Sequence, residues 1–219
     1  MEFNRRNTEK TAENTRIKIC GLRRMEDILC VNRLLPEYIG FVFASKSRRY
    51  ISPGEAGKLR EKLDPRIIPV GVFVDESPDT VADLLSSGLI DIAQLHGAED
   101  EPYMEALRRH TDRRVLKAFR IENGDDVRRA QQSSAWCVLA DSGEGGPGRS
   151  FDWSLLAGLE RPCFLAGGLN PENVGEAVRL LHPFAVDVSS GVETDGVKDP
   201  AKMEAFVRAV RAECGRHML

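Results

Sequence analysis

Eight short apolar runs, separated by segments that carry helix signals, constrain the fold of this chain more than any other feature. Successive runs start about 21 to 29 residues apart, which leaves room each time for a helix and two loops. Several runs are apolar throughout, as expected of strands buried on both faces of a parallel sheet. The runs are Ile17 to Cys20, Tyr38 to Phe43, Ile67 to Val74, Ile90 to Leu95, Val115 to Phe119, Trp136 to Ala140, Cys163 to Ala166 and Ala185 to Val188.

The segments between the runs predict helices. A polar residue followed by proline is a typical helix start, because the polar side chain caps free N–H groups and proline fits the first helical position. Such starts occur at Ser52, Ser77, Asn170 and Asp199. The first of them, with Glu55 three residues on, has the pattern of a capping box. Apolar residues follow at helical spacing, and the weakest segment, near Asp125 to Gln131, is short and polar.

Strands that alternate with helices indicate an α/β fold. Eight such units within 219 residues predict a single-domain (β/α)8 TIM barrel over residues 16–214, after a disordered leader at 1–15 and before a tail at 215–219. The alternative is an open doubly wound sheet, which usually shows a glycine-rich fingerprint after its first strand. Here the first strand is followed by Gly21, Leu22, Arg23 and Arg24, which is not such a fingerprint.

Composition excludes several classes of protein. A formal net charge of -3 gives no field that would attract nucleic acid or an anionic membrane. No apolar stretch is long enough to cross a bilayer, and the first fifteen residues lack a signal-peptide core. The five cysteines include no Cys-x-x-Cys pair, which argues against a disulfide framework and a zinc site. We therefore expect a cytoplasmic protein without a metal.

Two groups at strand ends are candidates for acid–base chemistry, because barrel enzymes carry their chemistry on the loops after the strands. Cys20 ends the first run, and its thiol could act as a general base or be an inert core group. Asp141 ends the sixth run, and its carboxyl could act as an acid or merely cap a turn. The glycine-rich loop that follows, with Gly146 at its centre, could lie close over a ligand.

The loops after the seventh and eighth runs predict a phosphate site. Small residues there leave backbone N–H groups open to an anion, and these are the strand positions where barrels commonly bind phosphate. The residues are Gly167 and Gly168 after the seventh run, and Asp187, Ser189, Ser190 and Gly191 at the end of the eighth.

Two further polar features follow strands. The cluster from Lys46 to Arg49 follows the second run and could bind a carboxylate through an arginine fork or simply be a solvated loop. His96 closes the fourth run, where it could equally be a structural hydrogen-bond partner.

Taken together and in this order, the motifs resemble phosphoribosylanthranilate isomerase. The resemblance covers nearly everything from Arg16 to about Val210, which makes it more specific than any single motif. It rests on Lys18–Gly21, Gly40–Phe43, Ser47–Tyr50, Val70–Phe73, Gln94–Gly97, Asp141 with its glycine loop and Phe151–Trp153, Ala166–Val174, Asp187–Glu193 and Lys198–Asp199.

The resemblance implies a barrel enzyme of tryptophan biosynthesis that uses no cofactor. The family reaction is an Amadori rearrangement of N-(5-phosphoribosyl)anthranilate, a small phosphorylated molecule, to a deoxyribulose product. By matching position, Cys20 would be the general base, Asp141 the general acid, and Arg49 the group that holds the anthranilate carboxylate. The two small-residue loops would hold the phosphate, and His96 would line the site. A complex with other enzymes of the pathway is compatible with this resemblance.

The chain departs from the family pattern at a few positions. Arg23 stands where a small polar residue is usual, and Ala166 stands where serine is frequent. Neither change removes a proposed catalytic group, although Arg23 is near the anthranilate side. Two alternatives remain at this point: another phosphate-binding barrel isomerase, and a barrel that binds a metabolite without catalysis.

Overall fold

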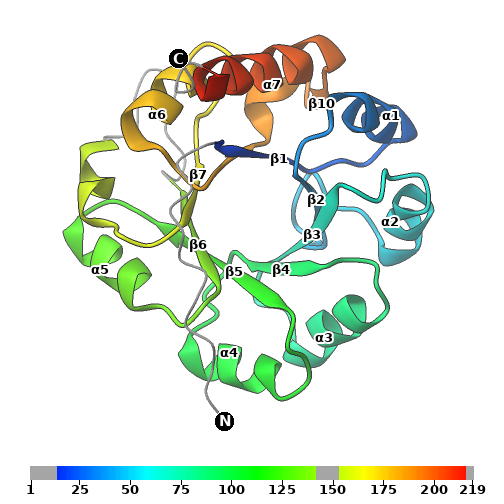
Figure 1. Cartoon of the computed structure of the whole chain (residues 1–219). Coiled ribbons are helices and arrows are strands. Elements are labelled where there is room, and N and C mark those ends of the chain that lie inside the picture. Colours follow the sequence, from blue (N-terminus) through cyan, green and yellow to red (C-terminus); the bar gives the residue numbers. More distant parts are fainter. Residues whose placement is uncertain (1–13, 142–152, 216–219) are drawn as a thin grey trace.

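Eight parallel strands close into a barrel in the computed structural model, which describes residues 14–141 and 153–215. Each strand pairs with the next along the chain, and β8 pairs with β1 to complete the ring. Figure 1 views this ring along its axis, with the helices outside it. The strands are β1 (Arg16–Cys20), β2 (Tyr38–Val42), β3 (Ile68–Phe73), β4 (Ile92–Leu95), β5 (Arg114–Arg120), β6 (Cys137–Asp141), β7 (Cys163–Ala166) and β8 (Ala185–Val188). The predicted single-domain (β/α)8 barrel is confirmed.

Helices follow most strands, and their predicted starts are largely confirmed. Ser52 accepts a hydrogen bond from the backbone N–H of Glu55 at the start of α2, and Ser77 accepts one from Thr80 at the start of α3. The polar segment near Asp125 is helical too, since Asn123 caps it. The helices are α1 (Met25–Leu34), α2 (Pro53–Arg60), α3 (Pro78–Ser86), α4 (Glu101–Arg108), α5 (Gly124–Gln132), α6 (Val174–Leu181) and α7 (Pro200–Gly215).

The last third of the barrel departs from simple alternation. In the described residues between β6 and β7, the helix position holds a 3-10 helix, η1 (Trp153–Gly158). After β8 come a short 3-10 helix, η2 (Ser190–Val192), and a small hairpin of β9 (Glu193–Thr194) and β10 (Val197–Lys198). The helix start predicted at Asn170 is a turn instead, because the Asn170 side chain accepts the N–H groups of Glu172 and Asn173 and delays α6.

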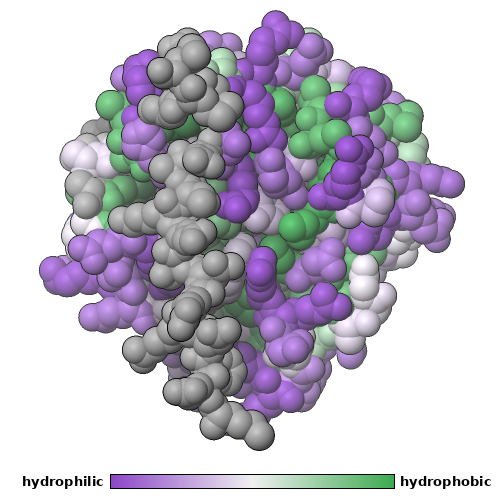
Figure 2. Space-filling model, viewed as in Figure 1, coloured by the Kyte–Doolittle hydropathy of each residue, from purple (hydrophilic) through white to green (hydrophobic). Residues whose placement is uncertain are grey.

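The ends of the chain lie mostly outside the described residues. Of the segment expected to be a leader, only residues 14 and 15 are described, and Thr15 is buried with its hydroxyl donating to the carbonyl of Pro183. No described helix has the length and apolar character needed to cross a bilayer. Hydrophilic residues dominate the rim of the face in Figure 2, with smaller hydrophobic areas between them.

The alternation of side chains along the strands decides what reaches the barrel interior. On β1, Ile17 and Ile19 pack outward in the main core beneath the helices, so Lys18 and Cys20 face inward. The amino-terminal end of the interior is filled by an aromatic cluster around Phe164, whose ring lies 5.3 Å from that of Tyr38 and 5.7 Å from that of Phe184. The interior is therefore apolar at one end and polar toward the other.

We expect the substitution Phe164→Ala to lower the free energy of unfolding by about 3–5 kcal/mol, because it opens a cavity in a fully buried cluster. Urea denaturation followed by tryptophan fluorescence and circular dichroism measures the change. The matched control is Leu180→Ala on α6, where the side chain is 58% exposed and the expected change is within about 0.5 kcal/mol. Equal losses in the two variants would contradict the assigned role of the cluster.

Candidate functional site

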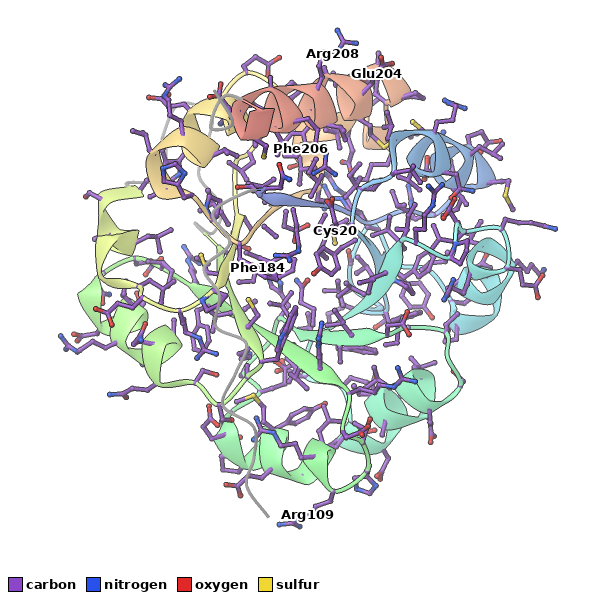
Figure 3. The ribbon with its side chains drawn as sticks, viewed as in Figure 1. Cys20, Arg109, Phe184, Glu204, Phe206 and Arg208 are labelled. Carbon is purple, nitrogen blue, oxygen red and sulfur yellow. The ribbon has the colours of Figure 1, made fainter. Side chains whose placement is uncertain are left out.

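Cys20 ends β1 on the inward side of the barrel. Its thiol lies directly against Gly40 of β2, where an added Cβ would be 2.6 Å from the sulfur. Glycine at this position is therefore required for the sulfur to occupy its place. Cys20 packs with Val42 and Val72 in a small buried cluster, and Figure 3 shows it inside the ring of strands, whereas Glu204 and Arg208 lie on the outer side of α7. The thiol thus faces the barrel interior.

A buried ion pair lies beside this thiol. The Lys18 ammonium is 2.8 Å from the Asp187 carboxylate, and the two residues face each other in the β1–β8 register. Lys18 is fully buried and Asp187 is 8% exposed. The second carboxylate oxygen of Asp187, Oδ1, is buried without a hydrogen-bond partner among the described residues.

The charges around the thiol act in opposite directions on its pKa. Burial is the largest influence on the pKa of Cys20 and raises it; the Lys18 and Lys198 ammonium groups lower it, the Asp187 carboxylate raises it, and the net direction is upward. Burial has the opposite effect on Lys18 and lowers its pKa. The interactions with Asp187 and Cys20 raise this pKa, and together they outweigh burial, so the net direction is upward. Lys18 is therefore the charged partner of the site, held so by the two groups beside it.

Asp141 at the end of β6 pairs with His96. The distance from His96 Nε2 to Asp141 Oδ2 is 3.2 Å, and both side chains are partly exposed. The Gln94 amide lies 2.8 Å from the other ring nitrogen, Nδ1. When the amide NH2 donates to Nδ1, the ring proton sits on Nε2 and points to the aspartate. Gln94 and His96 are two residues apart and so lie on the same side of β4.

Asp187 interacts electrostatically with both the thiol of Cys20 and the carboxyl of Asp141. Its pKa is raised by burial, lowered by Lys18 and His96, and raised by Asp141. Because all eight strands are parallel, β1 and β6 end at the same edge of the barrel. The structure therefore brings Cys20, Asp187, His96 and Asp141 together at one barrel mouth.

The loops predicted to bind phosphate pack on each other at this edge. A Cβ added at Gly191 would be 1.9 Å from the carbonyl oxygen of Leu169, so only glycine permits this contact. Gly167 and Gly168 both have positive φ, at 84° and 65°. Ser189 donates from its hydroxyl to the carbonyl of Cys20 at 3.0 Å, which fixes this loop beside the thiol.

Arg49 is held by a carboxylate that the sequence analysis did not assign. Glu193 accepts hydrogen bonds from Arg49 Nε at 2.7 Å and from Arg49 Nη2 at 3.0 Å. Lys198 also donates to Glu193, at 2.7 Å, and to the carbonyl of Ser189, at 2.8 Å. Glu193 and Lys198 therefore connect the arginine after β2 to the loop after β8.

Sequence reasoning gave no role to Lys18, Gln94, Glu193 or Lys198. One signal was available for the first two: a charged or amide residue within an otherwise apolar run, at even spacing from a candidate residue, must share its inward face. No comparable signal existed for Glu193, which accepts hydrogen bonds from Arg49 far earlier in the chain, or for Lys198, which donates to Glu193. Gly146 and the rest of its loop lie outside the described residues.

A separate hollow of about 500 Å³ lies between α4, α5 and the end of β5. Its buried polar groups are Lys117 and Glu99, which pair with each other at 2.9 Å. Lys117 also donates to the carbonyl of Gly97 at 2.7 Å. Because these groups satisfy each other and neither Cys20 nor Asp141 lines the hollow, the barrel mouth is the candidate active site.

Comparison with known proteins gives one consistent result. The family model described as N-(5'phosphoribosyl)anthranilate (PRA) isomerase matches residues 17–209. N-(5'-phosphoribosyl)anthranilate isomerases of Thermoanaerobacter sp. (strain X514) and Clostridium acetobutylicum are each 44% identical to this chain, over 90% of it and 98% of the relative. The solved phosphoribosyl anthranilate isomerase of Thermotoga maritima is 38% identical, with a TM-score of 0.83 over 90% of this chain and 99% of the other.

We expect Glu193→Gln to remove a pH-dependent contribution to the free energy of unfolding. Burial raises the pKa of Glu193, but hydrogen bonds and charge from Arg49 and Lys198 hold it at about 2, below the ordinary 4.5. A depressed pKa stabilises the fold above the unfolded pKa, and this contribution is lost as the pH falls from about 4.5 toward 2. The variant should be less stable than the parent at pH 7, with the difference shrinking toward pH 3.

Denaturant titrations at pH 7 and pH 3 measure this difference. The control is Glu204→Gln, whose exposed pair with Arg208 on α7 should contribute little at either pH. A difference of the same size at both pH values would mean that Glu193 acts through packing and not through its charge.

Proposed function

The chain belongs to the N-(5'-phosphoribosyl)anthranilate isomerase family, and we propose that Cys20 and Asp141 perform the proton transfers of its reaction. The chain is an enzyme of tryptophan biosynthesis, an isomerase that rearranges N-(5-phosphoribosyl)anthranilate to 1-(2-carboxyphenylamino)-1-deoxyribulose 5-phosphate. The two alternatives left open by the sequence, another barrel isomerase and a non-catalytic barrel, are set aside by this membership.

One observation supports the roles of Cys20 and Asp141 above all. An inward thiol and a partly exposed carboxyl lie at the same barrel edge, both within electrostatic reach of Asp187. An aldose-to-ketose rearrangement needs one group that donates a proton to the sugar and another that removes one. The site offers one candidate for each task.

The proposed reaction runs in three steps. Asp141, protonated, donates to the furanose ring oxygen, and the C1–O bond breaks to give an open-chain Schiff base. Cys20, as thiolate, removes the proton from the neighbouring carbon C2, which gives an enolamine. The enolamine then tautomerises to the ketone as C1 gains a proton and the hydroxyl on C2 loses one. His96, hydrogen-bonded to Asp141, orients the carboxyl and exchanges protons with it.

The remaining site residues are proposed to bind substrate. A solved relative, 38% identical to this chain, is complexed with reduced 1-(o-carboxyphenylamino)-1-deoxyribulose 5-phosphate. We propose that the backbone of the loops at Gly167–Gly168 and Ser189–Gly191 takes the phosphate and that Asp187 accepts from a sugar hydroxyl through its unpartnered oxygen. Arg49 would bind the anthranilate carboxylate, sharing its fork with Glu193. Gly146, which lies outside the described residues, is proposed as a further substrate-binding residue.

The proposed setting is the cytoplasm. The five cysteines are free thiols in the structure, as expected in a reducing compartment. The proposal includes a complex with other enzymes of tryptophan biosynthesis in this compartment. The chemistry uses side chains only, without a metal or cofactor.

We expect Cys20→Ala to lower kcat by about 10²–10⁴-fold, because a positioned base contributes that much, while a product analogue still binds. The assay follows the loss of fluorescence as freshly generated phosphoribosylanthranilate is converted. The control is Cys30→Ala on α1, a buried cysteine of the outer core, which should leave kcat within a few-fold. Near-normal turnover in Cys20→Ala would refute the role of base.

Asp141→Asn should likewise lower kcat by about 10²–10⁴-fold with a smaller effect on KM, because the amide keeps the size of the group but cannot protonate the ring oxygen. Asp79→Asn on α3, whose side chain is 79% exposed, serves as the control. A rise in KM with kcat unchanged would make Asp141 a binding group instead.

A further inference from the structure

The fully buried Lys18 has no part in the function described so far. Its ammonium is 2.8 Å from Asp187 Oδ2, and neither group reaches solvent appreciably. Burying such a pair is costly, and apolar residues of similar size often replace it without loss of stability. Stability alone is therefore a weak reason for a lysine in the middle of the first strand.

The position of Lys18 relative to Cys20 offers a better reason. The two residues are two apart on β1, so their side chains lie on the same inward face. The neighbouring strand supplies Asp187 in register with Lys18. The ammonium thus lies between a carboxylate and a thiol, and it interacts with both.

In the described part of the chain, the residues of β2 and β3 that pack against the thiol are uncharged. From β2 the thiol meets Gly40 and Val42, and from β3 it meets Val72. Among the described residues, the charged groups that act most strongly on Cys20 are Lys18 from β1, Asp187 from β8 and Lys198 from β10. His96 and Asp141 act in turn on Asp187. Of the charges, Lys18 has the largest effect on the thiol.

We propose that Lys18 is a positioning residue for the base: its ammonium, held in place and kept charged by Asp187, stabilises the thiolate of Cys20 inside the barrel mouth. This inference rests on the proposed role of Cys20 as base. Burial works against that role, because a thiol in apolar surroundings resists ionisation. A fixed cation beside the sulfur offsets part of this effect without entering the reaction. Lys18 itself is not placed to attack substrate, since its ammonium is engaged by Asp187.

The test measures the ionisation of Cys20 in the free enzyme. Iodoacetamide alkylates thiolate and not thiol, so the rate at Cys20, followed by mass spectrometry of its peptide, reports the pKa of this one cysteine. In Lys18→Met, which keeps the length of the side chain and loses its charge, the pH midpoint of alkylation should rise by about one unit or more. The acidic limb of the kcat/KM profile should move in the same direction. Lys58→Met, on the exposed face of α2, should shift neither.

A second variant covers the case in which Lys18→Met does not fold because Asp187 is left unpaired. Lys18→Met/Asp187→Asn removes both charges. Its midpoint should still rise, by less, because Lys18 acts more strongly on the thiol than Asp187 does.

An unchanged midpoint in a folded variant overturns the inference, even if the plateau rate changes. Failure of the proposed function is recognised separately: if Cys20→Ala stays active, Cys20 is not the base, whatever the alkylation midpoint of the Lys18 variants.

Discussion

The closure of the barrel between β1 and β8 is the constraint on which the site depends. This pairing sets Lys18 opposite Asp187 and places Cys20 one inward position further along β1. A shift of one residue in the register of β1 would turn Lys18 and Cys20 outward, which would leave the Lys18 ammonium against the apolar core beneath the helices and Asp187 unpaired inside the barrel. The cost of burying an unpaired charge therefore makes the correct closure strongly preferred. The same closure brings the first and eighth strands together, so that their ends lie at one edge of the barrel.

Much of this arrangement follows from the sequence. The apolar runs predicted all eight strands, and the even spacing of Lys18 and Cys20, or of Gln94 and His96, is enough to place each pair on one face. The predicted barrel implies that the first and eighth strands meet, but the register that sets Lys18 opposite Asp187 could not be predicted from the residues alone. The link between Arg49 and Glu193 is harder still: Glu193 lies in a two-residue strand after a 3-10 helix, and nothing local announces either element.

The departures in the last third of the chain have a physical cause. The Asn170–Pro171 pair has the pattern of a helix start, but Asn170 uses its side chain to close a turn and Asn173 donates to the carbonyl of Gly168. This turn lets Leu169 present its carbonyl to Gly191 at a distance that no other residue would allow. The loops after β7 and β8 are thus shaped by mutual contact, where local helix preference gives way to packing between segments far apart in the chain.

The charges at the barrel mouth are arranged so that each catalytic candidate has a neighbour of the kind it needs. The buried thiol lies next to Lys18, and the more exposed carboxyl lies next to His96. Asp187 interacts electrostatically with both pairs, since Lys18, His96 and Asp141 all affect its pKa. Burial in apolar surroundings destabilises a thiolate, and the proposed thiolate of Cys20 has the fixed ammonium of Lys18 beside it. The proposed acid, the carboxyl of Asp141, is nearer to solvent and has His96 as its hydrogen-bond partner. The proposed base and the proposed acid thus differ in burial, and each has a different kind of neighbour at the same barrel mouth.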